Sequence, residues 1–169
     1  KSFLSRKAEE LLRGLLELEI PEIEDGIIEI KNIAREAGSR TKVAVYSEDP
    51  NLDVKGACIG KNGMRIQSII DELQGEKIDI VLWDEDMTAF VKNALNPAEV
   101  ISVDIIENEE ERIARVVVNE DQLSLAIGKK GQNSRLAAKL CGIKIDIHTA
   151  ESYEDDQDEY EEDEIEGEE

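Results

Sequence analysis

Apolar residues recur along the chain with two different periods, which predict helices and strands in alternation. Between residues 66 and 73 the isoleucines and the leucine fall three or four positions apart, as on one face of a helix. Between residues 78 and 82 apolar and polar residues alternate, as in a half-buried strand. Gly75 lies between the two patterns, where it ends the helix. This stretch therefore predicts a helix followed by a strand.

The same succession occurs a second time in the chain, at a nearly constant separation. Residues 58–63, with the sequence CIGKNG, match AIGKKG at 126–131 with an offset of 68. The tetrapeptide KIDI at 77–80 returns unchanged at 144–147, with an offset of 67. We therefore predict that the chain contains two copies of one structural unit.

The segment upstream of the second glycine pair predicts a helix and a β-hairpin. Residues 84–95 fit a helix that ends at Asn96-Pro97, because the residue before a proline disfavours helical geometry. Two runs rich in β-branched residues follow at 100–106 and 113–118, separated by a polar, acidic turn.

The corresponding segment of the first copy is ambiguous by itself. The apolar residues from Ile27 to Ala37 fit the spacing of a helix as well as that of a strand. The repeat favours a hairpin with strands at 27–35 and 42–47, turning at 37–40. Residues 5–18 then supply the preceding helix.

Each copy thus has the predicted order helix, strand, strand, helix, helix, strand. Such a chain forms an α+β fold, with a three-stranded sheet and helices on one of its faces. We expect an N-terminal helix and linker at 1–20 that packs on the first domain, and we place that domain at 21–83. The second domain follows at 84–149. Residues 150–169 are expected to form a disordered acidic tail.

The net charge of −21 restricts the kind of ligand that the protein can bind. Of the 41 acidic residues, 13 lie in 151–169, which leaves 28 acidic residues against 20 Lys and Arg in residues 1–150. A nucleic-acid site must therefore be a local basic patch on an acidic body. The tail is too charged to fold, and either serves solubility or competes with RNA for basic residues.

Several classes of function find no support in the sequence. No stretch approaches the roughly 18 apolar residues of a membrane span, and no signal sequence is present, so a cytosolic protein is expected. Cys58, Cys141 and the single His148 are too few for a metal cluster or a disulfide framework, so we expect no metal and no cofactor. Residues 56–62 lack the glycine spacing and the Ser or Thr of a P-loop, which argues against NTP hydrolysis.

Two glycines three positions apart, between two helices, can let a nucleic-acid backbone approach closely. They lack a Cβ and accept positive φ, and the helix that follows directs its free amides toward phosphate. Lysines between the glycines add formal charge. One such loop is a weak signal, because it also serves as a plain turn between helices, but here it occurs twice in the same context. Loops of this kind clamp about four nucleotides in KH modules.

We predict an RNA site at both loops. Arg65 and Arg135, in the first turns of the following helices, either reach a phosphate or base or belong to an ordinary solvated helix face. The predicted RNA-binding residues are Gly60, Lys61, Asn62, Gly63, Arg65, Gly128, Lys129, Lys130, Gly131, Gln132, Asn133 and Arg135.

The chain resembles the tandem KH region of the NusA family of bacterial transcription elongation and termination factors. The resemblance covers nearly all of residues 3–148. It is carried by the segments 3–6, 17–26, 33–45, 56–63, 75–81, 94–98 and 122–140.

This resemblance implies type II KH folds, cytoplasmic residence and no catalysis. It also implies binding of single-stranded nascent or leader RNA during pausing, termination and antitermination, together with RNA polymerase and other elongation or antitermination factors. In this family a polymerase-binding domain and an oligonucleotide-binding barrel come before the KH region. Since the sequence contains neither and starts at Lys1 without Met, we expect a fragment that retains RNA binding.

The acidic body also suggests an alternative, a KH-fold scaffold for protein interactions with little RNA binding of its own. On the leading interpretation the protein is a monomer. One continuous RNA strand then crosses both loops, and neither loop alone binds tightly.

Overall fold

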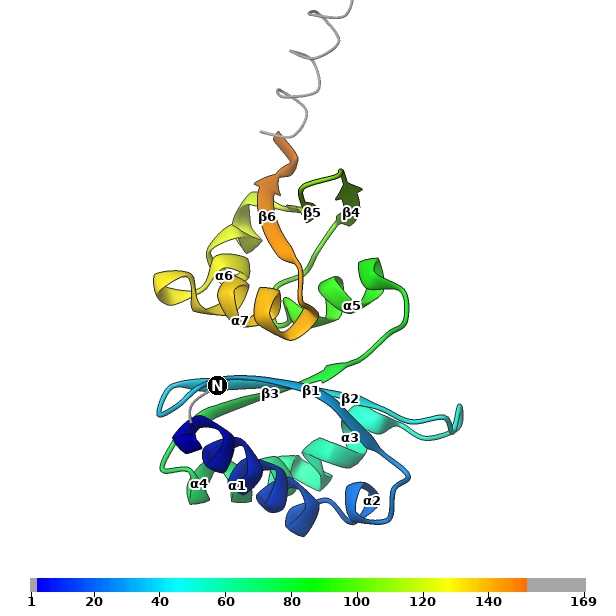
Figure 1. The fold of residues 1–169 in the computed structure, drawn as a ribbon, viewed down its shortest axis with the longest axis vertical. Coiled ribbons are helices and arrows are strands. Elements are labelled where there is room, and N and C mark those ends of the chain that lie inside the picture. The colour runs from blue at the N-terminus through cyan, green and yellow to red at the C-terminus, as the bar shows by residue number, and fades with distance from the viewer. Residues whose placement is uncertain (1–2, 152–169) are drawn as a thin grey trace, which may run out of the picture. The chain divides into compact units, whose positions relative to one another are not determined.

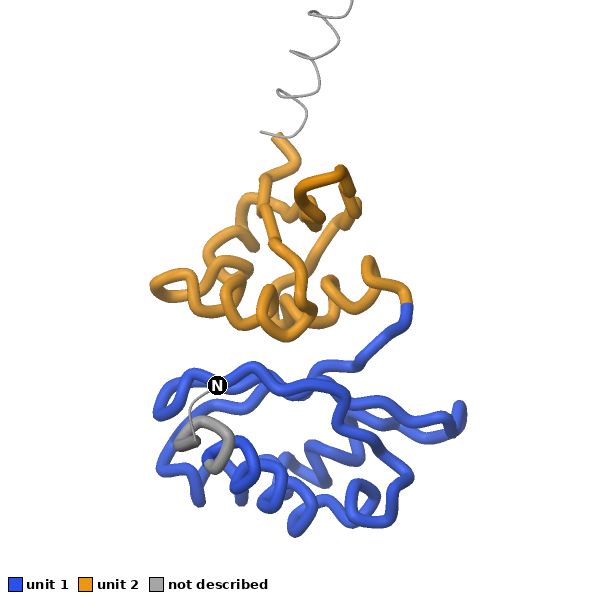
Figure 2. Tube along the Cα trace, viewed as in Figure 1, with its two compact units in different colours: residues 1–85 blue, residues 86–169 orange. Residues whose placement is uncertain are grey.

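The computed structural model describes residues 3–151, with side chains from residue 8 onward (Figure 1). The predicted disordered tail, apart from its first two residues, lies outside the described residues. The chain divides into two compact units, residues 1–85 and residues 86–169 (Figure 2). Each unit has its own three-stranded sheet.

The first unit has its helices on one face of the sheet, as Figure 1 shows for α1, α3 and α4. Strands β1 and β2 pair antiparallel, and β2 and β3 pair parallel, in the order β1-β2-β3. The elements are α1 (Phe3–Glu19), α2 (Pro21–Glu24), β1 (Glu29–Glu36), β2 (Arg40–Tyr46), α3 (Val54–Ile59), the 3-10 turn η1 (Lys61–Gly63), α4 (Met64–Glu72) and β3 (Lys77–Leu82).

The second unit repeats this topology with the sheet order β4-β5-β6. Its elements are α5 (Met87–Ala94), β4 (Ser102–Glu107), β5 (Arg112–Val118), the 3-10 turn η2 (Glu120–Gln122), α6 (Leu123–Ile127), the 3-10 turn η3 (Lys129–Gly131), α7 (Gln132–Cys141) and β6 (Lys144–Thr149). The predicted α+β fold of two tandem KH units is confirmed.

A β-bulge explains why the first strand was ambiguous in the sequence. The register of β1 against β2 shifts between Ile30 and Asn32. An extra residue in one strand interrupts the alternation of faces. As a result Ile30 and Ile33, three positions apart, both pack against the hydrophobic core of the first unit. A spacing of three is typical of a helix, so the pattern alone does not identify the strand.

Local hydrogen bonds set two element boundaries that differ from the predicted ones. β1 begins at Glu29 rather than residue 27, because the amides of Ile27 and Ile28 both donate to the carbonyl of Glu22 at 2.9 Å. α5 begins at Met87 rather than residue 84, because the carboxylate of Asp86 accepts from the Thr88 amide and caps the helix.

Both cores consist of aliphatic side chains between the helices and the sheet. In the first unit Leu12, Leu16 and Ile20 are fully buried in the core cluster, which attaches the N-terminal helix to the domain. In the second unit Ala114, Val116 and Val118 alternate along β5 and are fully buried. Leu136 and Leu140 of α7 are buried as well. In each unit the apolar faces of the helices and of the sheet thus pack into one core.

A buried carboxylate fastens the β1–β2 turn of the first unit to β3. Glu76 is only 1% exposed. It accepts hydrogen bonds from Arg35 Nε at 3.0 Å and Nη2 at 2.9 Å, from Thr41 Oγ1 at 2.7 Å and from the Gly38 amide at 2.8 Å. Burial by itself raises the pKa of Glu76, but the bonds from Arg35, Thr41 and Gly38 outweigh it and hold the pKa below its ordinary value. The carboxylate is therefore ionised in the folded protein.

Replacing Glu76 by Gln should lower the free energy of unfolding of the first unit by about 1–3 kcal/mol, because Arg35 loses its charged partner. The folded-state pKa lies below the ordinary value of 4.5, so this stabilisation is fully present above pH 4.5 and is lost as the pH falls through the folded-state pKa. Urea unfolding followed by the fluorescence of Trp83, the single tryptophan, measures both effects.

The control for this measurement is Glu72→Gln, which removes an exposed carboxylate at the end of α4. It should change the stability by less than about 0.5 kcal/mol. A difference between wild type and Glu76→Gln that stays constant from neutral to strongly acidic pH would contradict the assignment.

Candidate nucleic-acid interface

The two glycine loops have the same backbone conformation. The φ and ψ angles are 82° and 169° at Gly60, and 80° and 169° at Gly128. The third loop residues, Asn62 and Lys130, have φ angles of 57° and 56°. The fourth residues, Gly63 and Gly131, lie in the left-handed region with φ of 71° and 74°. The repeat in the sequence is thus a repeat of one local structure.

The first glycine of each loop is required by a close approach. A Cβ on Gly60 would lie 2.7 Å from Arg65 Cγ and 3.0 Å from the Arg65 backbone nitrogen. A Cβ on Gly128 would lie 2.7 Å from the backbone nitrogen of Asn133. These distances are far below van der Waals contact. The loop therefore packs directly on the first turn of the helix that follows it.

The second glycine of each loop has a different reason. Around Gly63 no heavy atom lies within 4 Å of an added Cβ, and at Gly131 the nearest is Arg135 Nη1 at 3.8 Å. What these positions require is the positive φ angle, which costs an L-residue about 1–2 kcal/mol. Lack of space therefore accounts for the first glycine of the motif, and the backbone conformation accounts for the second.

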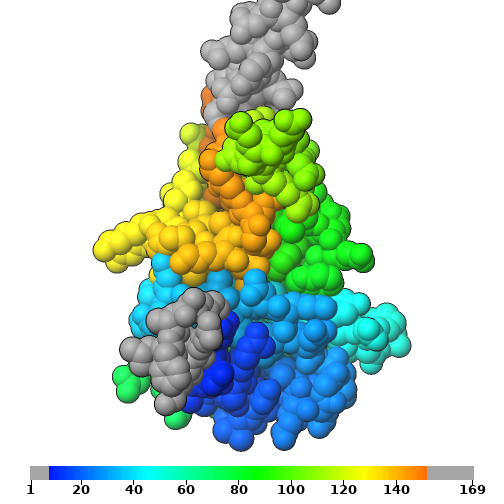
Figure 3. Space-filling view, in the orientation of Figure 1, coloured from blue at the N-terminus to red at the C-terminus, as the bar shows by residue number. Residues whose placement is uncertain are grey.

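Each loop presents charge at the start of a helix. Lys61, Asn62, Lys129 and Lys130 are exposed. α4 and α7 begin directly after the loops, so the positive end of each helix dipole lies beside these side chains. The segment between α6 and α7, yellow in Figure 3, projects from its own unit. This arrangement is suited to an anion such as a phosphate.

The guanidinium of Arg65 forms hydrogen bonds within the first unit. Arg65 Nη1 donates to Glu22 Oε2 at 2.7 Å and to the Ala57 carbonyl at 2.8 Å. The guanidinium thus joins α2 to the end of α3. Arg65 is partly buried, with 33% of its side chain exposed.

Asn133 occupies in the second unit the position that Arg65 occupies in the first, at the repeat offset of 68. It is only 2% exposed, and its Nδ2 donates to the carbonyls of Leu95 at 3.0 Å and Ala126 at 3.1 Å. Its side chain therefore faces the protein interior. Gln132, its neighbour at the start of α7, is half-buried.

Arg135 is exposed beside the second loop, where its Nη1 donates to the Lys130 carbonyl at 2.9 Å. The residue at the equivalent position of the first unit is Gln67, whose amide donates to Asp71. The second loop therefore has three cationic side chains, Lys129, Lys130 and Arg135. In the first loop only Lys61 is comparably exposed, since Arg65 is paired with Glu22.

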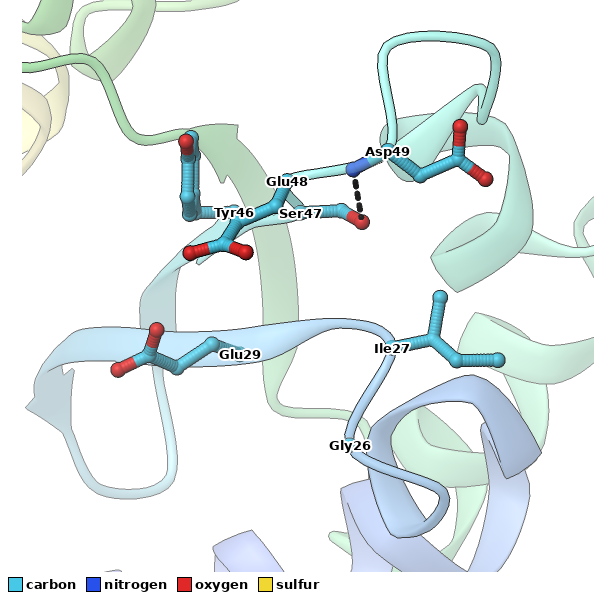
Figure 4. Close-up of a pocket in the computed structure, with 7 residues that line it drawn as sticks. All are labelled: Gly26, Ile27, Glu29, Tyr46, Ser47, Glu48 and Asp49. Carbon is cyan, nitrogen blue, oxygen red and sulfur yellow. Dashed lines mark hydrogen bonds between the residues drawn. The ribbon is translucent and has the colours of Figure 1, made fainter.

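A pocket of about 400 Å³ lies elsewhere in the first unit, where β1 and β2 diverge (Figure 4). Glu29, Glu48 and Asp49 contribute to its lining, and Tyr46 forms part of its wall. Three carboxylates and no lysine or arginine in the lining repel phosphate, so we do not assign this pocket to RNA. The sequence pattern does not predict this pocket, because its residues come from two separate segments, 26–29 and 46–49.

Within residues 3–151 no three His, Cys, Asp or Glu side chains come together in a way that could hold a metal ion. In the same range no helix combines the length and the apolar character that a membrane crossing requires.

Comparisons with known proteins match both units. The model of the NusA-like first KH domain matches residues 6–83, and that of the NusA-like second KH domain matches residues 87–155. A solved structure titled "Crystal structure of APE1850" shares the fold, with a TM-score of 0.58 and 24% identity, covering 79% of this chain and 95% of that one.

Three curated relatives carry the name "Transcription termination/antitermination protein NusA". The relative from Halalkalibacterium halodurans is 56% identical over 85% of this chain and 37% of its own length. Those from Bacillus subtilis, at 55% identity, and Mycobacterium tuberculosis, at 56%, cover 86% and 85% of this chain and 38% and 41% of themselves. The chain thus spans about two fifths of the length of these relatives.

The two glycines should differ in their response to alanine. In the first unit, Gly60→Ala should lower the unfolding free energy by more than about 2 kcal/mol, because strain at positive φ adds to the clash with Arg65. Gly63→Ala should cost only about 1–2 kcal/mol, because it meets strain alone. Trp83 fluorescence during urea unfolding gives both values.

Gly14→Ala is the control, since this glycine lies exposed in α1 with open space around it. There alanine should stabilise the unit by about 0.5–1 kcal/mol. Equal losses for Gly60→Ala and Gly63→Ala would show that close packing is not what the first glycine provides.

Proposed function

The chain belongs to the NusA family, and we propose that its two glycine loops bind single-stranded RNA by the sugar-phosphate backbone. The observation that carries this proposal is the shared geometry of the loops, each with exposed lysine beside the N-terminus of the following helix. A neutral or apolar ligand would make no use of these groups. Contacts to the sugar-phosphate backbone position the RNA strand without distinguishing its bases.

The RNA-facing set is narrower than the predicted one. We assign backbone contact to the glycine loops with Lys61, Asn62, Lys129 and Lys130, and phosphate contact to Arg135, which is exposed beside them. Gln132 lies close to the second loop and belongs to its margin. Arg65 and Asn133 form hydrogen bonds within the protein, which favours a role in supporting the loops over contact with RNA.

The names of the relatives support a place for this RNA binding in transcription. We propose that the protein acts in termination and antitermination by RNA polymerase in the cytoplasm. The RNA is then the nascent or leader transcript, and the partners are the polymerase and other elongation factors. Two loops on one monomeric chain raise the effective concentration of each for the same strand, so the pair binds more tightly than either alone.

The alternative is a scaffold that uses the KH folds for protein contacts. It is favoured by the excess of acidic over basic residues in residues 1–150, which repels RNA outside the loops. The two proposals differ in one measurable respect. A scaffold shows no salt-dependent affinity for RNA, whereas binding through lysine and arginine weakens steeply with salt.

Replacing Lys61 and Asn62 by Asp, or Lys129 and Lys130 by Asp, should each reduce affinity for an unstructured RNA oligonucleotide at least tenfold. Negative charge then faces the phosphates while the fold persists. Fluorescence anisotropy at low salt measures the affinity, and circular dichroism confirms folding. The control for the second pair is Lys92→Asp with Lys144→Asp, which makes the same charge change at exposed positions in the same unit. If the control pair Lys92→Asp with Lys144→Asp lost as much affinity as the pair Lys129→Asp with Lys130→Asp, the loss would be a general charge effect. The assignment would then be overturned.

The second loop should supply most of the salt dependence. It has three cationic side chains against one in the first loop, and each phosphate contact on a single strand contributes about 0.7 to the slope of log affinity against log salt. The variant with Lys129→Asp and Lys130→Asp should therefore lower the slope more than the variant with Lys61→Asp and Asn62→Asp. Titrations at four or more salt concentrations test this, and the reverse order would contradict it.

A further inference from the structure

We infer that Arg65 and Asn133 are positioning residues, which hold the two glycine loops in the conformation that binds RNA. Each fastens its loop to the helix that precedes the first strand of its sheet, α2 in the first unit and α5 in the second. The inference deepens the proposed function and rests on it. It separates these two residues from the lysines, which contact the ligand.

The first loop is fastened by an ion pair. Arg65 Nη1 bridges Glu22 Oε2 of α2 and the Ala57 carbonyl of α3, at 2.7 and 2.8 Å. The stem of the same side chain lies where a Cβ on Gly60 would clash, so it packs directly against the loop. Glu22 is itself fixed, because its carbonyl accepts from the amides of Ile27 and Ile28 at the start of the sheet. The contact thus joins the loop to the α2–β1 junction.

The second loop is fastened at the equivalent position by a neutral amide. Asn133 Nδ2 bridges the carbonyl of Leu95, which caps α5, and the carbonyl of Ala126 in α6. Its backbone packs on Gly128 as Arg65 packs on Gly60. The Asn133 Oδ1 is buried without a hydrogen-bond partner. A buried acceptor without a partner is unfavourable. The stabilisation that Asn133 provides must therefore come from the two hydrogen bonds that its Nδ2 donates.

The loops benefit from such support because their backbone conformation is unusual. In the first loop the Gly63 amide donates to the Gly60 carbonyl at 3.0 Å and the Met64 amide to the Lys61 carbonyl. In the second loop the Gly131 amide donates to the Gly128 carbonyl at 3.1 Å and the Gln132 amide to the Lys129 carbonyl. Three of the four residues in each loop have positive φ. A chain in water rarely adopts this sequence of angles by itself. Fixing it in advance lowers the ordering cost of binding RNA.

The decisive test is Glu22→Gln, because electrostatics and positioning predict opposite signs. Removing a negative charge near the loop, and releasing Arg65, should tighten RNA binding if charge alone matters. If Arg65 positions the loop, affinity for an unstructured RNA oligonucleotide should fall threefold to tenfold at low salt. Glu24→Gln removes the same charge from an exposed residue of α2 and is the matched control, expected to bind as tightly as wild type or slightly more.

Two further variants separate positioning from contact and from stability. Arg65→Lys keeps the charge but not the planar group that bridges two acceptors, so a phosphate contact would survive it and a positioning role would not. Asn133→Ala should weaken binding threefold or more although its side chain is buried. The loop amides of Gly63 and Gly131 should exchange hydrogen faster in the respective variants, while circular dichroism shows that both units are still folded.

The outcomes distinguish this inference from the proposed function. If wild type binds and the Asp variants of the loops do not, but Glu22→Gln binds as tightly as Glu24→Gln, only the positioning role is overturned. If wild type shows no salt-dependent RNA binding, the proposed function falls and the inference falls with it. Combining Glu22→Gln with Lys61→Asp and Asn62→Asp should give no further loss, because the loop that Arg65 positions is already inactive.

Discussion

The structure depends most on the close approach between the first glycine of each loop and the helix residue five positions later. This approach leaves no room for a side chain on Gly60 or Gly128. It brings two helices together through a turn of three residues, so the start of the second helix cannot be covered by the loop itself. The exposed lysines beside each helix start are a consequence of that packing. The phosphate site that we propose thus follows from a steric requirement.

The two units achieve the same geometry with different chemistry. In the first, ion pairs are used repeatedly: Glu76 with Arg35, and Glu22 with Arg65. In the second, Asn133 bridges two carbonyls at the position of Arg65 without any formal charge. A partly exposed ion pair weakens as salt screens it, whereas a buried amide does not. Two similar loops can therefore respond differently to the ionic conditions around them.

The acidic character of this protein restricts which parts of its surface could bind nucleic acid. An acidic body repels nucleic acid, so the RNA affinity that we propose must come from a few cations held at fixed positions. The positions are fixed because the lysines lie on loops whose backbone angles agree between the units to within a few degrees. In the proposed site, a few lysines on ordered loops thus serve in place of a large basic surface. The acidic pocket between β1 and β2 marks a region where RNA is disfavoured.

The sequence by itself determined the order of elements, the duplication and the places of both loops, because hydrophobic period and glycine spacing are local properties. The local pattern alone did not decide the segment at 27–35, where a bulge gives a strand the spacing of a helix, and only the repeat identified it as a strand. It also grouped Arg65 with Arg135, although the repeat offset of 68 pairs Arg65 with Asn133, and the structure shows that the side chains of Arg65 and Asn133 both bond within the protein. Which carbonyl or carboxylate a side chain meets depends on residues such as Glu22 and Leu95, about 40 positions away along the chain. Only the folded chain brings those atoms within hydrogen-bond distance, so only the tertiary structure distinguishes a side chain that is bonded in the interior, such as Asn133, from an exposed one, such as Arg135.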